Sequence, residues 1–128
     1  MITMAEKKTI KDLYNYVKSI LSSTENLKSI YIGKTSSVRN TEKRYQNDYD
    51  ETHIIVSGTP NLVSKAEDFF IKHLKEDLQG VKVDNKNEGS GGSTTANMLY
   101  ISWNVKYENI EQLFEPDFES YDFELIEG

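Results

Sequence analysis

The chain of 128 residues contains no cysteine, only two prolines and two histidines, and no long apolar run. Without cysteine it can form no disulfide, no thiolate metal site and no cysteine nucleophile. No stretch approaches the roughly 18 apolar residues that a membrane-spanning helix needs, and the N-terminus lacks a signal-peptide pattern. We therefore expect a soluble, intracellular (cytoplasmic) protein without a membrane partner, and the length fits one domain with a buried core.

The negative charge is concentrated at one end of the chain. The formal net charge is −6, which disfavours binding to phosphate groups. Residues 106–128 hold eight acids and one base and carry −7, so residues 1–105 carry +1. Within that nearly neutral part, five basic residues surround the segment IYIGKT: Lys28, Lys34, Arg39, Lys43 and Arg44. Either this is a nucleic-acid-binding patch or an ordinary mixed, solvated surface.

Hydrophobic periodicity and turn residues predict an alternation of helices and short strands. Thr9 is a candidate N-cap for the first helix, and Thr59, Pro60 and Gly80 mark the start and end of the third. The expected helices cover 9–22, 40–47 and the stretch from Pro60 to Gly80, and the expected strands cover 28–33, 53–57, 81–84 and 98–107.

One acid falls inside the apolar stripe of the third predicted helix. With about 100° per residue, Glu67 projects to the same side as Val63, Phe70 and Leu74. An ionised carboxylate in apolar surroundings is unfavourable unless a cation stabilises it. Two interpretations remain open: Glu67 is a buried functional group, or it lies at the edge of the stripe and reaches water.

The C-terminal part differs in composition from the rest. A glycine- and serine-rich loop follows residue 85, and residues 115–128 alternate acids with aromatics. We therefore predict one domain over 1–114, beginning with the first helix, and an acidic-aromatic tail over 115–128.

The order of these features resembles the GIY-YIG nucleases. YIGKT (31–35) looks like the second-strand signature, EKRYQ (42–46) like the arginine helix, AEDFFIKHL (66–74) like the glutamate helix, and NKNEGSGG (85–92) like the closing segment. The first half of the signature is missing, and Tyr16 is a candidate replacement for its tyrosine. Arg39 competes with Arg44, and Asn85 is favoured over Asn87.

The resemblance implies a site for phosphodiester hydrolysis. Glu67 would bind Mg²⁺ or Mn²⁺, Arg44 would hold a phosphate oxygen, Tyr31 would orient or deprotonate the attacking water, and Asn85 would brace the site. Lys34, Arg39 and Lys43 would contact DNA. Oligomeric state is not determined by these features.

We expect a small α+β domain with a mixed, mainly antiparallel sheet of three or four strands flanked by helices, similar to the GIY-YIG fold. The leading function is a metal-dependent DNA endonuclease. The alternative is an inactive scaffold that binds a protein partner, or inhibits one, through the acidic tail.

Overall fold

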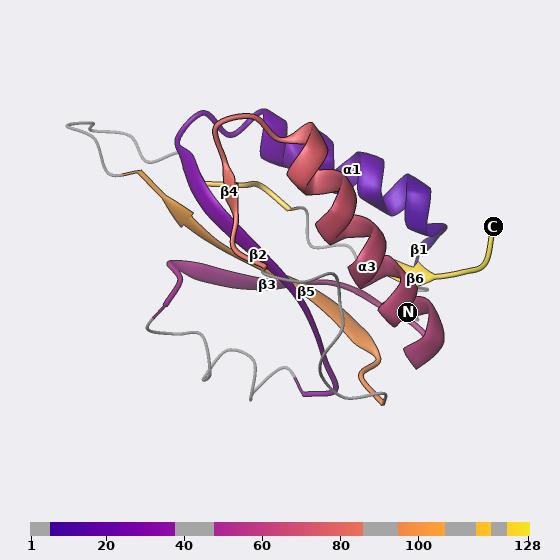
Figure 1. The fold of residues 1–128 in the computed structure, drawn as a ribbon. Coiled ribbons are helices and arrows are strands. Elements are labelled where there is room, and N and C mark those ends of the chain that lie inside the picture. The colour runs from indigo at the N-terminus through magenta and orange to yellow at the C-terminus, as the bar shows by residue number, and fades with distance from the viewer. Residues whose placement is uncertain (1–5, 38–47, 86–94, 107–114, 119–122) are drawn as a thin grey trace, which may run out of the picture.

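The computed structural model describes residues 6–37, 48–85, 95–106, 115–118 and 123–128. In these residues the chain forms two α-helices and a six-stranded mixed sheet (Figure 1). The strands are β1 (Glu6–Lys8), β2 (Leu27–Thr35), β3 (Glu51–Ser57), β4 (Lys82–Val83), β5 (Met98–Val105) and β6 (Phe123–Leu125), and the helices are α1 (Ile10–Ser22) and α3 (Pro60–Asp77).

Both helices begin at the threonines that the sequence predicts. The hydroxyl of Thr9 accepts from the backbone N–H of Asp12, and that of Thr59 accepts from Leu62. Each bond satisfies an N–H that the first helical turn leaves without a partner. Pro60 then occupies the first turn, where its missing N–H has no cost.

The strand order is β1-β6-β3-β5-β2-β4. The two long pairings, β2 with β5 and β3 with β5, are antiparallel, whereas β1 with β6, β3 with β6 and β2 with β4 are parallel. β5 is therefore the centre of the sheet, with β2 on one side and β3 on the other.

Both helices cover the same face of the sheet (Figure 1). Ile30 and Ile32 of β2 point to this face together with Ile101 of β5, and all three side chains are fully buried. They pack in one core with the apolar stripes of α1 and α3. Because side chains alternate along a strand, the residues between them point to the opposite face, away from the helices.

The α+β class and the mixed sheet are confirmed, but the expected number of three or four strands is wrong. The described residues contain two additional strands of three residues each, β1 and β6. The helix predicted over 40–47 lies outside the described residues.

The predicted division at residue 115 is not seen in the sheet. Phe123 and Leu125 of β6 are 5% and 3% exposed and belong to the core, and β6 lies between β1 and β3. Pro116 is also buried, and Phe118 stacks on His53. These residues are therefore part of the domain, because their apolar side chains complete its core.

Neither helix in the described part of the chain is both long and apolar enough to cross a membrane.

Candidate functional site

Glu67 lies on the buried side of α3, as its position in the apolar stripe predicts. Its side chain is only 6% exposed, and among the described residues its buried Oε1 atom has no hydrogen-bond partner. Burial raises the pKa of the Glu67 carboxyl to about 7; Lys34 acts in the opposite direction, and Asp68 adds to the rise. A buried carboxyl with an unsatisfied oxygen is costly to maintain, which is why such groups concentrate at functional sites.

Among the described residues, Lys34 is the cation whose positive charge lowers the pKa of this carboxyl. It lies near the end of β2 on the helix-covered face, and its Nζ donates to Oγ of Ser64 on α3 at 3.0 Å. Ser64 precedes Glu67 by three residues, so the two lie on neighbouring positions of the same helix. Lys34 and Ser64 are both only half-buried, so this side of Glu67 lies nearer the surface than the carboxyl itself.

Asn85 is buried against the edge of β2. Its Oδ1 accepts from the backbone N–H of Ile32 at 3.0 Å, and its Nδ2 donates to the carbonyl of the same residue at 2.7 Å. The side-chain amide thus forms the two hydrogen bonds to Ile32 that the backbone of a neighbouring strand would form. Asn85 braces the backbone just before Lys34, and both polar ends of its side chain are used in doing so.

Tyr31 is not brought to Glu67. It alternates with Ile30 and Ile32 on β2 and therefore points to the face away from the helices. There its ring centroid lies 6.1 Å from that of Tyr49 and 6.2 Å from that of Tyr100. The sheet separates the two side chains, so the expected arrangement of Tyr31 acting on water beside a metal at Glu67 is not found.

Tyr31, Tyr49 and Tyr100 form a tyrosine row on this face, and the sequence alone identified neither Tyr49 nor Tyr100 as part of it. Tyr100 pairs directly with Gly33 across β2 and β5, and a Cβ on Gly33 would lie 2.3 Å from the Tyr100 ring. The glycine of the YIG segment therefore makes room for this ring. Tyr16, the candidate for the missing first-strand tyrosine, is instead in α1 and contacts Phe123. The sequence places Tyr100 in the strand segment MLYISW, but it does not indicate that this tyrosine lies opposite Gly33.

Four of the predicted site residues lie outside the described residues: Arg39, Lys43, Arg44 and Asn87. The chain leaves the described structure after Ser37, beyond the end of β2, and returns at Asp48, before β3.

A divalent cation can be tested against this donor set. No group of three His, Cys, Asp or Glu side chains suited to a metal occurs in the described residues. Mg²⁺, however, is commonly held by one or two carboxylates, with water and phosphate oxygens completing its shell. The unsatisfied Oε1 of Glu67 fits the role of a single protein ligand of this kind.

Comparison with protein-family models, curated proteins and solved structures gave no match.

Proposed function

We propose that this chain is a divalent-metal-dependent nuclease that hydrolyses phosphodiester bonds in DNA, with Glu67 as the metal ligand. The observation that carries the proposal is the buried Glu67 carboxyl, which has an unsatisfied oxygen and a pKa raised to about 7. In a purely structural helix, an apolar residue at this position would avoid that cost.

Residues from three of the four segments that resemble the nuclease family are joined through β2 and α3 in the described part of the chain, whereas EKRYQ (42–46) lies outside it. Lys34 of the YIGKT segment contacts α3 through Ser64, Glu67 lies on the next turn, and Asn85 holds Ile32. These residues are separated by up to about fifty positions in the chain, and only the fold joins them. Their convergence supports a common site at the end of β2.

Each residue of this site has a separate role in the proposed reaction. Glu67 would hold Mg²⁺ or Mn²⁺, which when bound offsets negative charge on a phosphodiester. Lys34 exchanges its bond to Ser64 for one to a phosphate oxygen. Arg44, or Arg39 in its place, supplies a bidentate contact to a second oxygen. Asn85 fixes the backbone that presents Lys34. Tyr31 has no role in this proposal, because it points to the other face.

Nicking of plasmid DNA in a manganese titration tests the proposal. We expect the parent chain to nick the plasmid and Glu67→Gln to lose about 100-fold or more of that activity, because the amide cannot replace a charged metal ligand. Saturating Mn²⁺ should also raise the unfolding temperature of the parent chain but not that of Glu67→Gln.

Asp68→Asn is the matched control. Asp68 is the next residue on α3, it is exposed, and the substitution removes one negative charge in the same way. This variant should nick DNA and respond to Mn²⁺ like the parent. Full metal-dependent nicking by Glu67→Gln would refute the assignment of Glu67, and a parent chain that never nicks DNA would refute the nuclease.

The second candidate function is an inactive scaffold that binds or inhibits a protein. It is favoured by the separation of Tyr31 from Glu67 and by the complete use of the Asn85 amide in holding Ile32. Its contact surface would include the exposed acids of the C-terminal part: Glu115, Asp117, Glu124 and Glu127. A nuclease should bind DNA more weakly as salt rises, whereas this scaffold should show no DNA affinity at any salt concentration.

A further inference from the structure

β4 is too short to be held against β2 by its own backbone pairing. It pairs with β2 at only two positions, fewer than an isolated pair of strands needs to be stable. The chain then continues along β2: the backbone N–H of Asp84 donates to the carbonyl of Ile30 at 2.8 Å, and Asn85 follows with its two bonds to Ile32. The brace on β2 therefore depends on whatever fixes Asp84.

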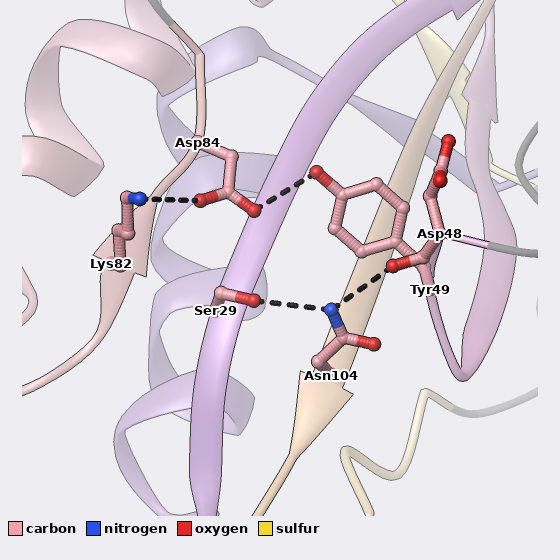
Figure 2. Close-up of polar contacts among 6 residues, drawn as sticks. All are labelled: Ser29, Asp48, Tyr49, Lys82, Asp84 and Asn104. Atoms are coloured by element: carbon pink, nitrogen blue, oxygen red, sulfur yellow. Dashed lines mark hydrogen bonds and ion pairs between the residues drawn. The ribbon is translucent and has the colours of Figure 1, made fainter.

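The Asp84 side chain is fixed by a tyrosine from another part of the chain. Oη of Tyr49 donates to Oδ2 of Asp84 at 2.9 Å (Figure 2). The other oxygen, Oδ1, lies 3.9 Å from Nζ of Lys82, whose side chain is 81% exposed. An ion pair that is this exposed and this long contributes little. The hydrogen bond from Tyr49 is the stronger of these two contacts.

Tyr49 is itself held on both sides along the chain. Nδ2 of Asn104 donates to the carbonyl of Asp48 at 3.2 Å (Figure 2). Oδ1 of Asn104 accepts from the backbone N–H of Asp50 at 2.9 Å. Oδ2 of Asp50 accepts from the backbone N–H of Val105 at 2.9 Å. These bonds hold residues 48–50 against the end of β5, the central strand. The backbone position of Tyr49 is therefore fixed.

We propose that Tyr49 and Asp84 are positioning residues for the candidate site at the end of β2. Their hydrogen bond fixes the chain after β4, so that Asn85 reaches Ile32 and keeps the following backbone, with Lys34, beside Glu67. The link to catalysis rests on the proposed function, whereas the link from Tyr49 to the Asn85 brace does not.

Amide hydrogen exchange at Ile32 measures the brace directly, because this N–H donates to Asn85 Oδ1. In Tyr49→Phe, which removes only the hydroxyl, we expect exchange at Ile32 to become about five- to tenfold faster relative to amides in α3, as for the loss of one hydrogen bond. Asp84→Ala should behave in the same way. Asp84→Asn keeps an acceptor oxygen for Tyr49 and should remain close to the parent.

The manganese concentration for half-maximal nicking is the second readout. We expect it to rise about tenfold in Tyr49→Phe and Asp84→Ala, because a displaced Lys34 would hold less well the phosphate that would complete the coordination of a metal on Glu67. Tyr14→Phe is the matched control, because Tyr14 makes an equivalent hydrogen bond to Asp77 between the two helices. It should lower the unfolding temperature without changing the manganese midpoint or the relative exchange at Ile32.

The outcomes separate the two proposals. If the parent does not nick DNA, the nuclease fails, but exchange at Ile32 still decides the positioning role. If Tyr49→Phe and Asp84→Ala fold and exchange at Ile32 as the parent does, the positioning role is refuted. If exchange rises in these variants while the manganese midpoint stays constant, Tyr49 and Asp84 brace β2 without serving the metal site, and the proposed role at that site is refuted.

Discussion

At the scale of single residues, Glu67 shows what the sequence can reveal. Its position in the apolar stripe of a helix follows from spacing alone, and the structure places it at 6% exposure. The alternation of Ile30, Tyr31 and Ile32 on a strand was equally visible. It predicts that Tyr31 faces away from the core that holds the two isoleucines, so Tyr31 and Glu67 belong to opposite faces of the sheet.

The raised pKa of Glu67 predicts an unusual pH dependence of stability. Burial raises this pKa from the ordinary 4.5 to about 7, so the folded protein binds the proton more tightly than the unfolded chain. The contribution of Glu67 to the free energy of unfolding is fully present below about pH 4.5 and is lost as pH rises to about 7. The loss is roughly 3 kcal/mol for the metal-free protein.

Urea unfolding between pH 5 and 8 checks this prediction. Glu67→Gln has no ionisable group at this position, so its stability should lack the fall between about pH 5 and 7 that the parent shows. Asp68→Asn should keep this fall in stability, shifted slightly to lower pH, because Asp68 is exposed but adds to the raised pKa of Glu67. Parallel profiles for the parent and Glu67→Gln would contradict a raised pKa at this position.

At the scale of secondary structure, the five long elements and the short strand β4 were predictable from the sequence, whereas β1 and β6 were not. α1, α3, β2, β3 and β5 all lie within a few residues of their predicted ranges, because each has a cap or a run of β-branched and aromatic residues. β1 and β6 have three residues each, too few for an alternating pattern to be distinguished from chance. Their pairing depends on contacts distant in sequence.

The pairing of β2 with β5 predicts the effect of adding one methyl group. In Gly33→Ala the new Cβ would meet the buried ring of Tyr100 at 2.3 Å, so the ring or the strand must shift. We expect a loss of about 1–3 kcal/mol in the free energy of unfolding, as is typical of overpacking.

A double-mutant cycle in urea tests the cause of that loss. When Tyr100→Ala removes the ring, Gly33→Ala should cost close to nothing, because the obstacle is gone. An equal cost of Gly33→Ala in both backgrounds would show that the strain comes from the backbone and not from Tyr100.

At the scale of the whole molecule, the strand order was the feature that sequence could not supply. β5 follows β4 in the chain but inserts between β2 and β3, and β6 inserts between β1 and β3. Local patterns predict which residues form strands, but pairing is decided by how well whole faces bury one another. Both the tyrosine row and the position of the C-terminal part follow from this order.

The place of β6 predicts that the C-terminal part is needed for stability. Leu125 is buried, and a Cβ on Gly58 would lie 2.9 Å from its Cβ, so the two segments are closely packed. Leu125→Ala should lower the free energy of unfolding by about 2–5 kcal/mol. Thermal or urea unfolding measures this loss.

Glu124→Ala provides the comparison on the same strand. Glu124 is exposed, so its removal should change stability by no more than about 0.5 kcal/mol. Equal, small effects of both substitutions would mean that the segment behaves as a separate tail.

The pairing of β1 with β6 also bears on how the protein is made. Glu6 is opposite Phe123, and each of the three partners is 117 positions from its counterpart. On the ribosome, the first strand must therefore wait, without its neighbour in the sheet, until nearly all of this sequence has been synthesised. Contacts this distant along the chain slow folding, and a strand left waiting can pair with other chains. The two lysines in β1 reduce that risk, because charged edge strands aggregate poorly.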